Sequence, residues 1–194
     1  MTQLEAVNEL LAACQEAPIN SLEGALPSIA SRALACLNRN SSRVQLKGWT
    51  FNTDRNVTLN PNGSNEIVLA SNVLSVEIDG STVQSEDPVF LNGKIYDRWN
   101  QTYTISRSLK AFKIVYLRDW DQLPPVAQDY ITRRSARLFQ DEIYGASELR
   151  ASASREEAEA YSELRRLRNR EGRPNLLTND STWNIIGGGR GPRQ

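Results

Sequence analysis

Apolar residues recur three or four positions apart at both ends of the chain, which is typical of amphipathic helices. The first such run predicts a helix over 2–14, and Thr2 and Glu5 fit a capping box at its beginning. The second run predicts a helix that begins with Ser28 as its N-cap. Its apolar face extends to Val44, but residues 38–42 are weak helix formers, so the helix is expected to fray before Val44. The two apolar faces comprise Leu4, Val7, Leu10, Leu11 and Cys14 in the first helix, and Ile29, Ala33, Cys36, Leu37 and Val44 in the second.

The same spacing returns after residue 120. Pro125 suits the first turn of a helix, where its missing N–H costs nothing, and this third helix is expected to end near Ile143 with Gly145 just beyond it. A fourth helix is expected over 148–170. Its apolar stripe is thin and its charges are dense, and the stripe comprises Leu149, Ala153, Ala160, Leu164 and Leu167.

Between residues 49 and 119 the helical spacing gives way to short segments rich in β-branched and aromatic residues. Turn-forming pairs such as Asp79-Gly80 and Asn92-Gly93 separate them. We expect an antiparallel meander of about six strands, either sandwich-like or strongly curved. The seven β-rich segments from which these strands are expected to form are 50–52, 57–59, 66–70, 73–78, 89–91, 103–106 and 112–117.

The order of these elements predicts an α+β fold. Residues 1–48 and 120–171 are expected to form an antiparallel helical bundle from the N- and C-terminal helices. Residues 49–119 are expected to form a central antiparallel β-rich, sandwich-like domain. Three tryptophans at the edges of expected elements should pack in the core or at an interface, and these are Trp49, Trp99 and Trp120.

The C-terminal tail, residues 172–194, differs in composition from the rest of the chain. It is rich in glycine and carries three arginines against one aspartate, which predicts a flexible segment in the free subunit. Trp183, Ile185 and Ile186 are too apolar for a pure spacer. Because tryptophan often dominates the energetics of an interface, these residues are expected to anchor the tail on a partner.

Composition and charge exclude several classes of function. The 194 residues include 23 Lys and Arg and 23 Asp and Glu, and this zero net charge disfavours a protein that coats nucleic acid. The chain has no histidine, so catalytic sites of the Ser/His/Asp and Cys/His kinds are excluded. Cys14 and Cys36 alone cannot build a zinc site and are expected as buried thiols. We therefore predict no catalytic, cofactor-binding or metal-binding residue, and no membrane-spanning helix.

Two alternative functions remain compatible with the sequence. Asp119, Asp121 or Glu142 could serve a cell-wall hydrolase that works with paired carboxylates, although acids at 119 and 121 more simply serve a turn and a helix start. A nucleic-acid-binding regulator could use the arginines of the fourth helix and the Gly-Arg tail.

The charges of the fourth helix are segregated along its length, which complements the helix dipole. The helix is either a solvated peripheral element or one that packs against another subunit or partner. The acids are Glu156, Glu157, Glu159 and Glu163, and the bases that follow are Arg165, Arg166, Arg168 and Arg170.

Several strings in fixed order carry a family resemblance, the longest being LRDWDQLP at 117–124. The others lie at 7–11, 18–24, 47–52, 96–98, 136–140 and 144–146. Together they cover residues 4–150 and resemble the tail tubular protein A family of short-tailed bacteriophages. This family forms the adaptor, or gatekeeper, between the portal and the tail nozzle.

The resemblance implies a structural, non-enzymatic subunit of a dodecameric ring around the DNA channel. The portal protein would lie on one side and the tubular nozzle protein on the other, with the tail fibre as a further candidate contact. DNA would pass through without specific binding, and the protein would be made in the host cytoplasm and reside in the virion tail. Related adaptors engage the portal with their C-terminal helix and tail, and this implies portal binding by Arg165, Arg166, Arg168, Arg170, Trp183, Ile185 and Ile186.

Overall fold

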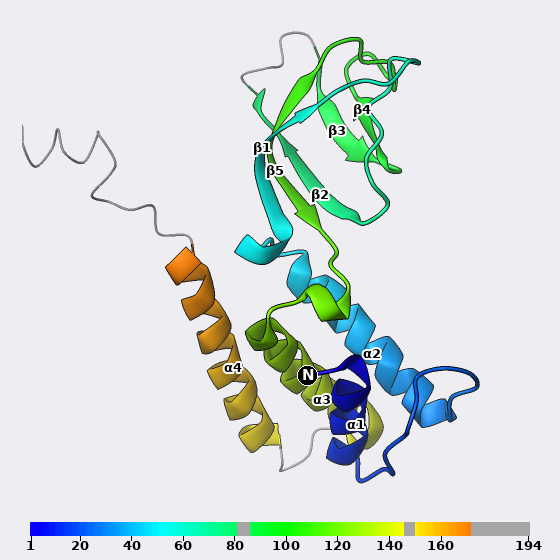
Figure 1. Ribbon diagram of the computed structural model, residues 1–194, viewed down its shortest axis with the longest axis vertical. Coiled ribbons are helices and arrows are strands. Elements are labelled where there is room, and N and C mark those ends of the chain that lie inside the picture. Colours follow the sequence, from blue (N-terminus) through cyan, green and yellow to red (C-terminus); the bar gives the residue numbers. More distant parts are fainter. Residues whose placement is uncertain (81–85, 146–149, 172–194) are drawn as a thin grey trace, which may run out of the picture.

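The computed structural model describes residues 1–80, 86–145 and 150–171. Helices occupy one end of the elongated molecule and β-strands the other (Figure 1). We call these the helical part and the β part. The predicted α+β class is confirmed.

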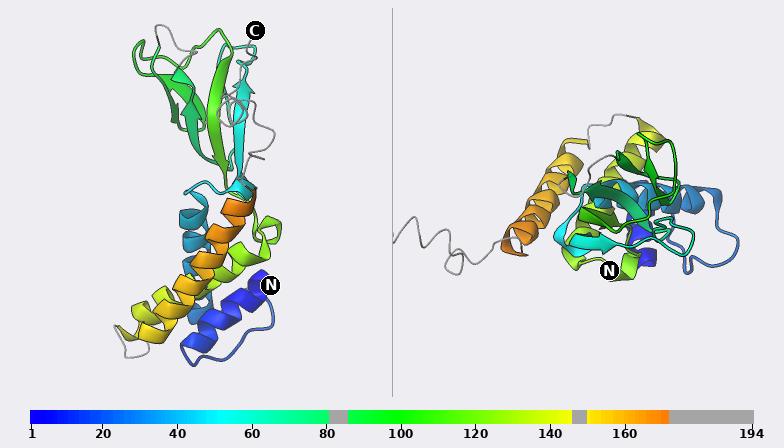
Figure 2. Two further views of the ribbon diagram at one scale, coloured as in Figure 1. Left: turned by 90° about the vertical axis from the view of Figure 1, so that its left-hand side faces the viewer. Right: turned by 90° about the horizontal axis from the view of Figure 1, so that it is seen from above.

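One of the four helices contacts the other three. The four are α1 (Gln3–Ala13), α2 (Ser28–Gln45), α3 (Pro125–Tyr144) and α4 (Arg150–Glu171). Helix α3 contacts each of the other three, and α4 runs along the side of α3 up to the start of the β part (Figures 1 and 2). The surface of α3 is therefore covered on several sides by α1, α2 and α4.

The helix ends follow from their local sequence, with one correction. The Thr2/Glu5 capping box is confirmed, because the Glu5 amide donates to Thr2 Oγ1 at 3.2 Å and the Thr2 amide donates to Glu5 Oε2 at 2.7 Å. Ser28 was wrongly expected as the N-cap of α2. It is the first helical residue, and the cap position is taken by Pro27, whose fixed backbone angle directs the chain into the helix.

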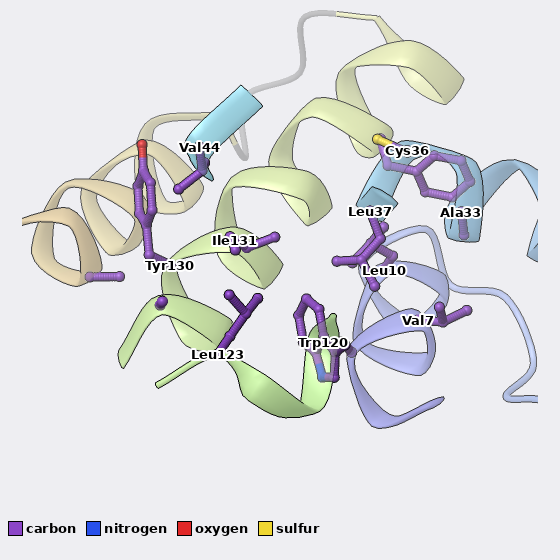
Figure 3. Close-up of a cluster of buried hydrophobic side chains, with 14 of the residues drawn as sticks. Val7, Leu10, Ala33, Cys36, Leu37, Val44, Trp120, Leu123, Tyr130 and Ile131 are labelled. Carbon is purple, nitrogen blue, oxygen red and sulfur yellow. The ribbon is translucent and has the colours of Figure 1, made fainter. Parts of the chain in front are cut away.

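The core of the helical part is formed by apolar side chains from α1, α2 and α3. In the close-up of Figure 3, Leu10, Leu37 and Ile131 approach one another from these three helices. Trp49 and Trp120 are buried at the edge of this cluster, as predicted. Cys14 and Cys36 are buried free thiols, also as predicted.

The β part contains an antiparallel three-stranded sheet and a two-stranded one. The strands are β1 (Thr53–Leu59), β2 (Val73–Ile78), β3 (Pro88–Leu91), β4 (Lys94–Asp97) and β5 (Leu109–Tyr116). The order β1-β5-β2 places the last strand between the first two, while β3 pairs with β4. The predicted meander is therefore wrong in its connectivity, since β1 and β2 are not neighbours.

Individual strand predictions fared unevenly. Residues 50–52 form a 3-10 helix, η1 (Thr50–Asn52), and a second, η3 (Trp120–Gln122), precedes α3. Residues 66–70 and 103–106 make isolated bridges, such as the one between Glu66 and Thr104, in place of strands. These segments are held by a second buried cluster of apolar side chains, and that cluster comprises Leu59, Ile67, Val73, Ile95, Ile105, Leu109, Ala111 and Ile114.

A buried polar junction connects the helical part to the β part. The side chain of Gln45, at the end of α2, accepts a hydrogen bond from the Arg118 amide at 2.8 Å and donates to the Arg118 carbonyl at 3.0 Å. Gly48 has a φ of +71°, and a Cβ there would lie 2.7 Å from Lys113 Cε. Glycine is needed at this position because the chain turns tightly against β5.

Asn52 completes the junction. Its Oδ1 accepts from the Trp49 amide at 2.8 Å, and its Nδ2 donates to the carbonyls of Gln45 at 3.0 Å and Tyr116 at 2.7 Å. Both Asn52 and Gln45 are fully buried. Side-chain amides therefore tie the end of α2 to β5 and to the segment that follows it.

Candidate assembly surface

Helix α4 is held on α3 by few apolar contacts. Leu164 and Ala160 are its buried apolar residues in the described part of the chain, with Leu164 fully inaccessible. The Tyr161 ring lies 5.2 Å from the Tyr130 ring and 6.3 Å from the Trp49 ring, measured between centroids. Of the thin stripe predicted from the sequence, Ala160 and Leu164 belong to the buried cluster of the helical part, whereas Leu149 lies outside the described residues.

Ion pairs supply the remaining contacts between the two helices. Arg133 pairs with Glu156 at 2.9 Å, and Arg134 pairs with Glu157 at 2.8 Å. Arg137 contributes a second bond to Glu157, whose side chain is 12 % exposed. The hydrogen bond to Glu157 raises the pKa of the Arg137 guanidinium. Glu156 and Glu157, two of the acids predicted on α4, therefore hold this helix against α3.

The arginines at the end of α4 remain exposed. Arg165, Arg166, Arg168 and Arg170 all face solvent. Arg166 pairs with Glu163 one turn earlier, whereas the described residues provide no ion-pair partner for the other three. The end of α4 is therefore a concentrated positive surface beside the base of the β part (Figure 2).

The predicted anchor in the C-terminal tail lies outside the described residues. Trp183, Ile185 and Ile186 all belong to residues 172–194, which begin directly after α4. The arginines and the tail are consecutive in the chain, so any partner held by one is within reach of the other.

Residues 4–174 match the family model described as Tail tubular protein. The chain belongs to the tail tubular protein family. The match includes all of α4, which the resembling strings did not reach. No curated protein sequence matches the chain. This family member is a structural protein of a bacteriophage tail, and its location is the virion tail.

The carboxylates considered for hydrolysis belong to two different elements of this tail tubular protein. Asp119 is the N-cap residue of η3 and Asp121 lies in its first turn, and both are exposed. Glu142 lies near the end of α3 and pairs with Arg32 at 2.9 Å and Arg39 at 3.5 Å. The hydrogen bond from Arg32 lowers the pKa of Glu142, whereas a general acid needs a raised pKa.

Trp99 was expected in the core or at an interface. It is not in the core, because it is 78 % exposed on the turn that follows β4, and the interface alternative stays a prediction. Asp97 fixes this turn because its buried carboxylate accepts from the amides of Asp87 and Trp99, both at 2.9 Å, and from Asn100 Nδ2 at 2.6 Å. Burial raises the pKa of Asp97, but these hydrogen bonds outweigh it and lower the pKa overall.

Several of these features could not be predicted from the sequence. The pairing of α3 arginines with α4 glutamates depends on how two helices meet, and a sequence pattern within one helix does not encode that. Within residues 1–80, 86–145 and 150–171, no group of three potential metal-ligating side chains comes together. Nor does any helix in these ranges have the length and apolar character required to cross a membrane.

Proposed function

We propose that this tail tubular protein is a subunit of the adaptor ring that connects the portal to the tail nozzle around the DNA ejection channel. The ring would be a dodecamer, assembled in the host cytoplasm. The observation that carries the proposal is the exposed arginine end of α4, which leads directly into the tail in a member of this family.

The end of α4 and the tail are the proposed portal-binding surface. Arginine and tryptophan are the residues that most often dominate binding at protein interfaces. A helix end with three arginines unpaired within the described chain would gain ion pairs on an acidic partner without breaking internal ones. The seven proposed residues are Arg165, Arg166, Arg168, Arg170, Trp183, Ile185 and Ile186.

The β part would then face the nozzle protein and the tail fibre. The end of α4 lies near the base of the β part, and the strands extend from there to the far end of the long axis, which leaves the tip of the β part for these contacts (Figure 1). The zero net charge of the chain suits a ring that lets DNA pass without specific binding.

Mixing the purified protein with portal rings tests the proposal directly. Electron microscopy should reveal a discrete larger particle with a continuous ring of added density. Absence of a complex at micromolar concentrations of both components would count against the adaptor function.

Two variants test the binding surface. Deleting residues 172–194, or replacing the four arginines with alanine, should weaken portal binding at least about tenfold while the subunit stays folded. The matched control is Arg155→Ala, which removes an exposed arginine from the other end of α4. Equal affinity in the deletion variant and the full chain would reject the role of the tail.

A further inference from the structure

A groove along α1 carries an unusual excess of negative charge. The first 31 residues contain four glutamates and neither lysine nor arginine. Three of them, Glu5, Glu9 and Glu16, line one open groove of about 580 Å³, and we call them the glutamate row. Met1, Ala12 and Pro18 supply apolar surface to the same groove.

Hydrogen bonds fix the shape of this groove. The side chain of Asn8 accepts from the Ile19 amide at 2.9 Å and donates to the Ile19 carbonyl at 3.0 Å, which closes the loop after α1 against the helix. The Glu16 amide donates to the Leu11 carbonyl at 3.0 Å, so Glu16 continues the line of carboxylates beyond the helix end. All three glutamates are exposed, and the described chain offers none of them an ion-pair partner.

Helix α2 presents the opposite charge. It contains Arg32, Arg39 and Arg43 and no acidic residue. These three arginines, which we call the arginine row, are exposed along one edge of the helix, with the exposed Leu46 at its end. Glu142 is shared between Arg32 and Arg39, so one carboxylate faces two guanidinium groups and the edge stays positive.

The two rows match in spacing when they run in opposite directions. Consecutive members of the glutamate row are four and then seven residues apart. Consecutive members of the arginine row are seven and then four residues apart. At a rise of about 1.5 Å per residue the helical steps from Glu5 to Glu9 and from Arg39 to Arg43 are both about 6 Å. An antiparallel arrangement therefore brings Glu5 and Glu9 opposite Arg43 and Arg39, with Glu16, beyond the end of α1, on the side of Arg32.

The rows cannot satisfy each other within one subunit. The arginine row contacts Glu142 on α3. Glu9 of the glutamate row lies near Arg133, on the side of α3 that packs against α4. No ion pair joins the two rows anywhere in residues 1–80, 86–145 and 150–171. Contact between such different patches of identical chains is head-to-tail, the type of contact that closes a ring.

We propose that the glutamate row of one subunit binds the arginine row of the next, and that this contact joins neighbouring copies laterally. The inference rests on the proposed ring and specifies the surfaces that build it. The pairs are Glu5 with Arg43, Glu9 with Arg39, and Glu16 with Arg32.

The environment of Glu9 agrees with a missing positive partner. Partial burial raises the pKa of Glu9, and Asp129 and Glu5 raise it further, although Arg133 opposes them. A guanidinium from a neighbouring subunit would stabilise the charged form of this carboxyl.

Charge reversal tests the pairing. Self-association of the full-length chain is measured by sedimentation velocity between 10 and about 500 µM at low salt, where exposed charges are least screened. Glu9→Arg alone and Arg39→Glu alone should each weaken association about tenfold, because each places like charges in contact. An equimolar mixture of the two variants should restore it, since every contact can then pair opposite charges. The matched control is Glu23→Arg, an exposed glutamate that does not line the groove.

The outcomes separate this inference from the proposed function. A wild-type chain that stays monomeric throughout the range, or a mixture that associates no better than either variant alone, would overturn the pairing even if portal rings are bound. Restored association in the mixture without any binding to portal rings would support the pairing and reject the adaptor function.

Discussion

Replacing Asn52 with leucine should loosen the junction between the helical part and the β part. The two side chains are similar in size, so the substitution removes hydrogen bonds without opening a large cavity. Three main-chain groups would lose the hydrogen bond to Asn52, namely the Trp49 amide and the carbonyls of Gln45 and Tyr116. The Gln45 carbonyl keeps a second bond, from the Gly48 amide at 3.0 Å. Because Asn52 is fully buried, water cannot replace the lost amide.

The expected loss follows from counting these bonds. A hydrogen bond within a protein contributes about 1 kcal/mol net, and a buried group left without a partner costs about 1–3 kcal/mol. One lost bond at the Gln45 carbonyl and two groups that lose the Asn52 amide, at Trp49 and Tyr116, give an expected loss of about 3–7 kcal/mol in the free energy of unfolding. Many domains have only about 5–15 kcal/mol in total, so the effect is large.

Urea unfolding followed by circular dichroism measures this loss. The matched control is Asn38→Leu, since Asn38 is an exposed residue of α2 with a single side-chain hydrogen bond, to Gln3. The control should change the free energy of unfolding by less than about 1 kcal/mol. A comparably small loss in Asn52→Leu would refute the view that this side chain secures the junction.

Two further predictions concern α4 and the acid stability of α3. Leu164→Ala should cost about 2–5 kcal/mol in urea unfolding because Leu164 is fully buried, and more than Leu167→Ala, where the side chain is partly exposed; equal losses would contradict this. Arg32 and Arg39 lower the pKa of Glu142, so the unfolded chain binds a proton there first. The stability from this pairing is present above about pH 4.5 and is lost as pH falls through the lowered pKa. Glu142→Gln should therefore lose less stability than the wild type between pH 7 and pH 3 in the same assay, and an unchanged pH dependence would contradict this.

The helices could be predicted because their signal is local. The spacing of Leu4, Val7 and Leu10 reflects a face that one helix buries, and it fixes where α1 begins and ends to within one residue. For α2, weak helix formers near its end do not shorten the helix, because Val44 is buried against the core and carries the helix on to Gln45.

The β part was harder to predict because strand pairing is not local. Residues 50–52 have β-branched and aromatic character, yet Asn52 folds back to cap its own Trp49 amide and closes a 3-10 turn. The strand order β1-β5-β2 pairs residues that are 33 to 62 positions apart, from Ile78 with Ala111 to Thr53 with Val115. Such pairing depends on the whole sheet, so it cannot be predicted from a short segment of the sequence.

The two candidate binding surfaces also differ in how much of each can be predicted from the sequence. The arginines of α4 are visible as a run in the sequence, and the structure adds only that they are exposed. The complementary rows on α1 and α2 need the folded arrangement, because Glu16 joins the row only through the loop that Asn8 closes.

The exposed indole of Trp99 gives the protein a spectroscopic reporter of its surroundings. Trp49 and Trp120 are shielded from water, so their fluorescence should lie at shorter wavelengths and resist quenching by acrylamide. Trp99 sits on a turn fixed by Asp97, and any molecule that covers this tip of the β part would exclude water from the ring. Contact there would shift its emission toward the blue, so docking at this end can be followed optically without attaching a dye.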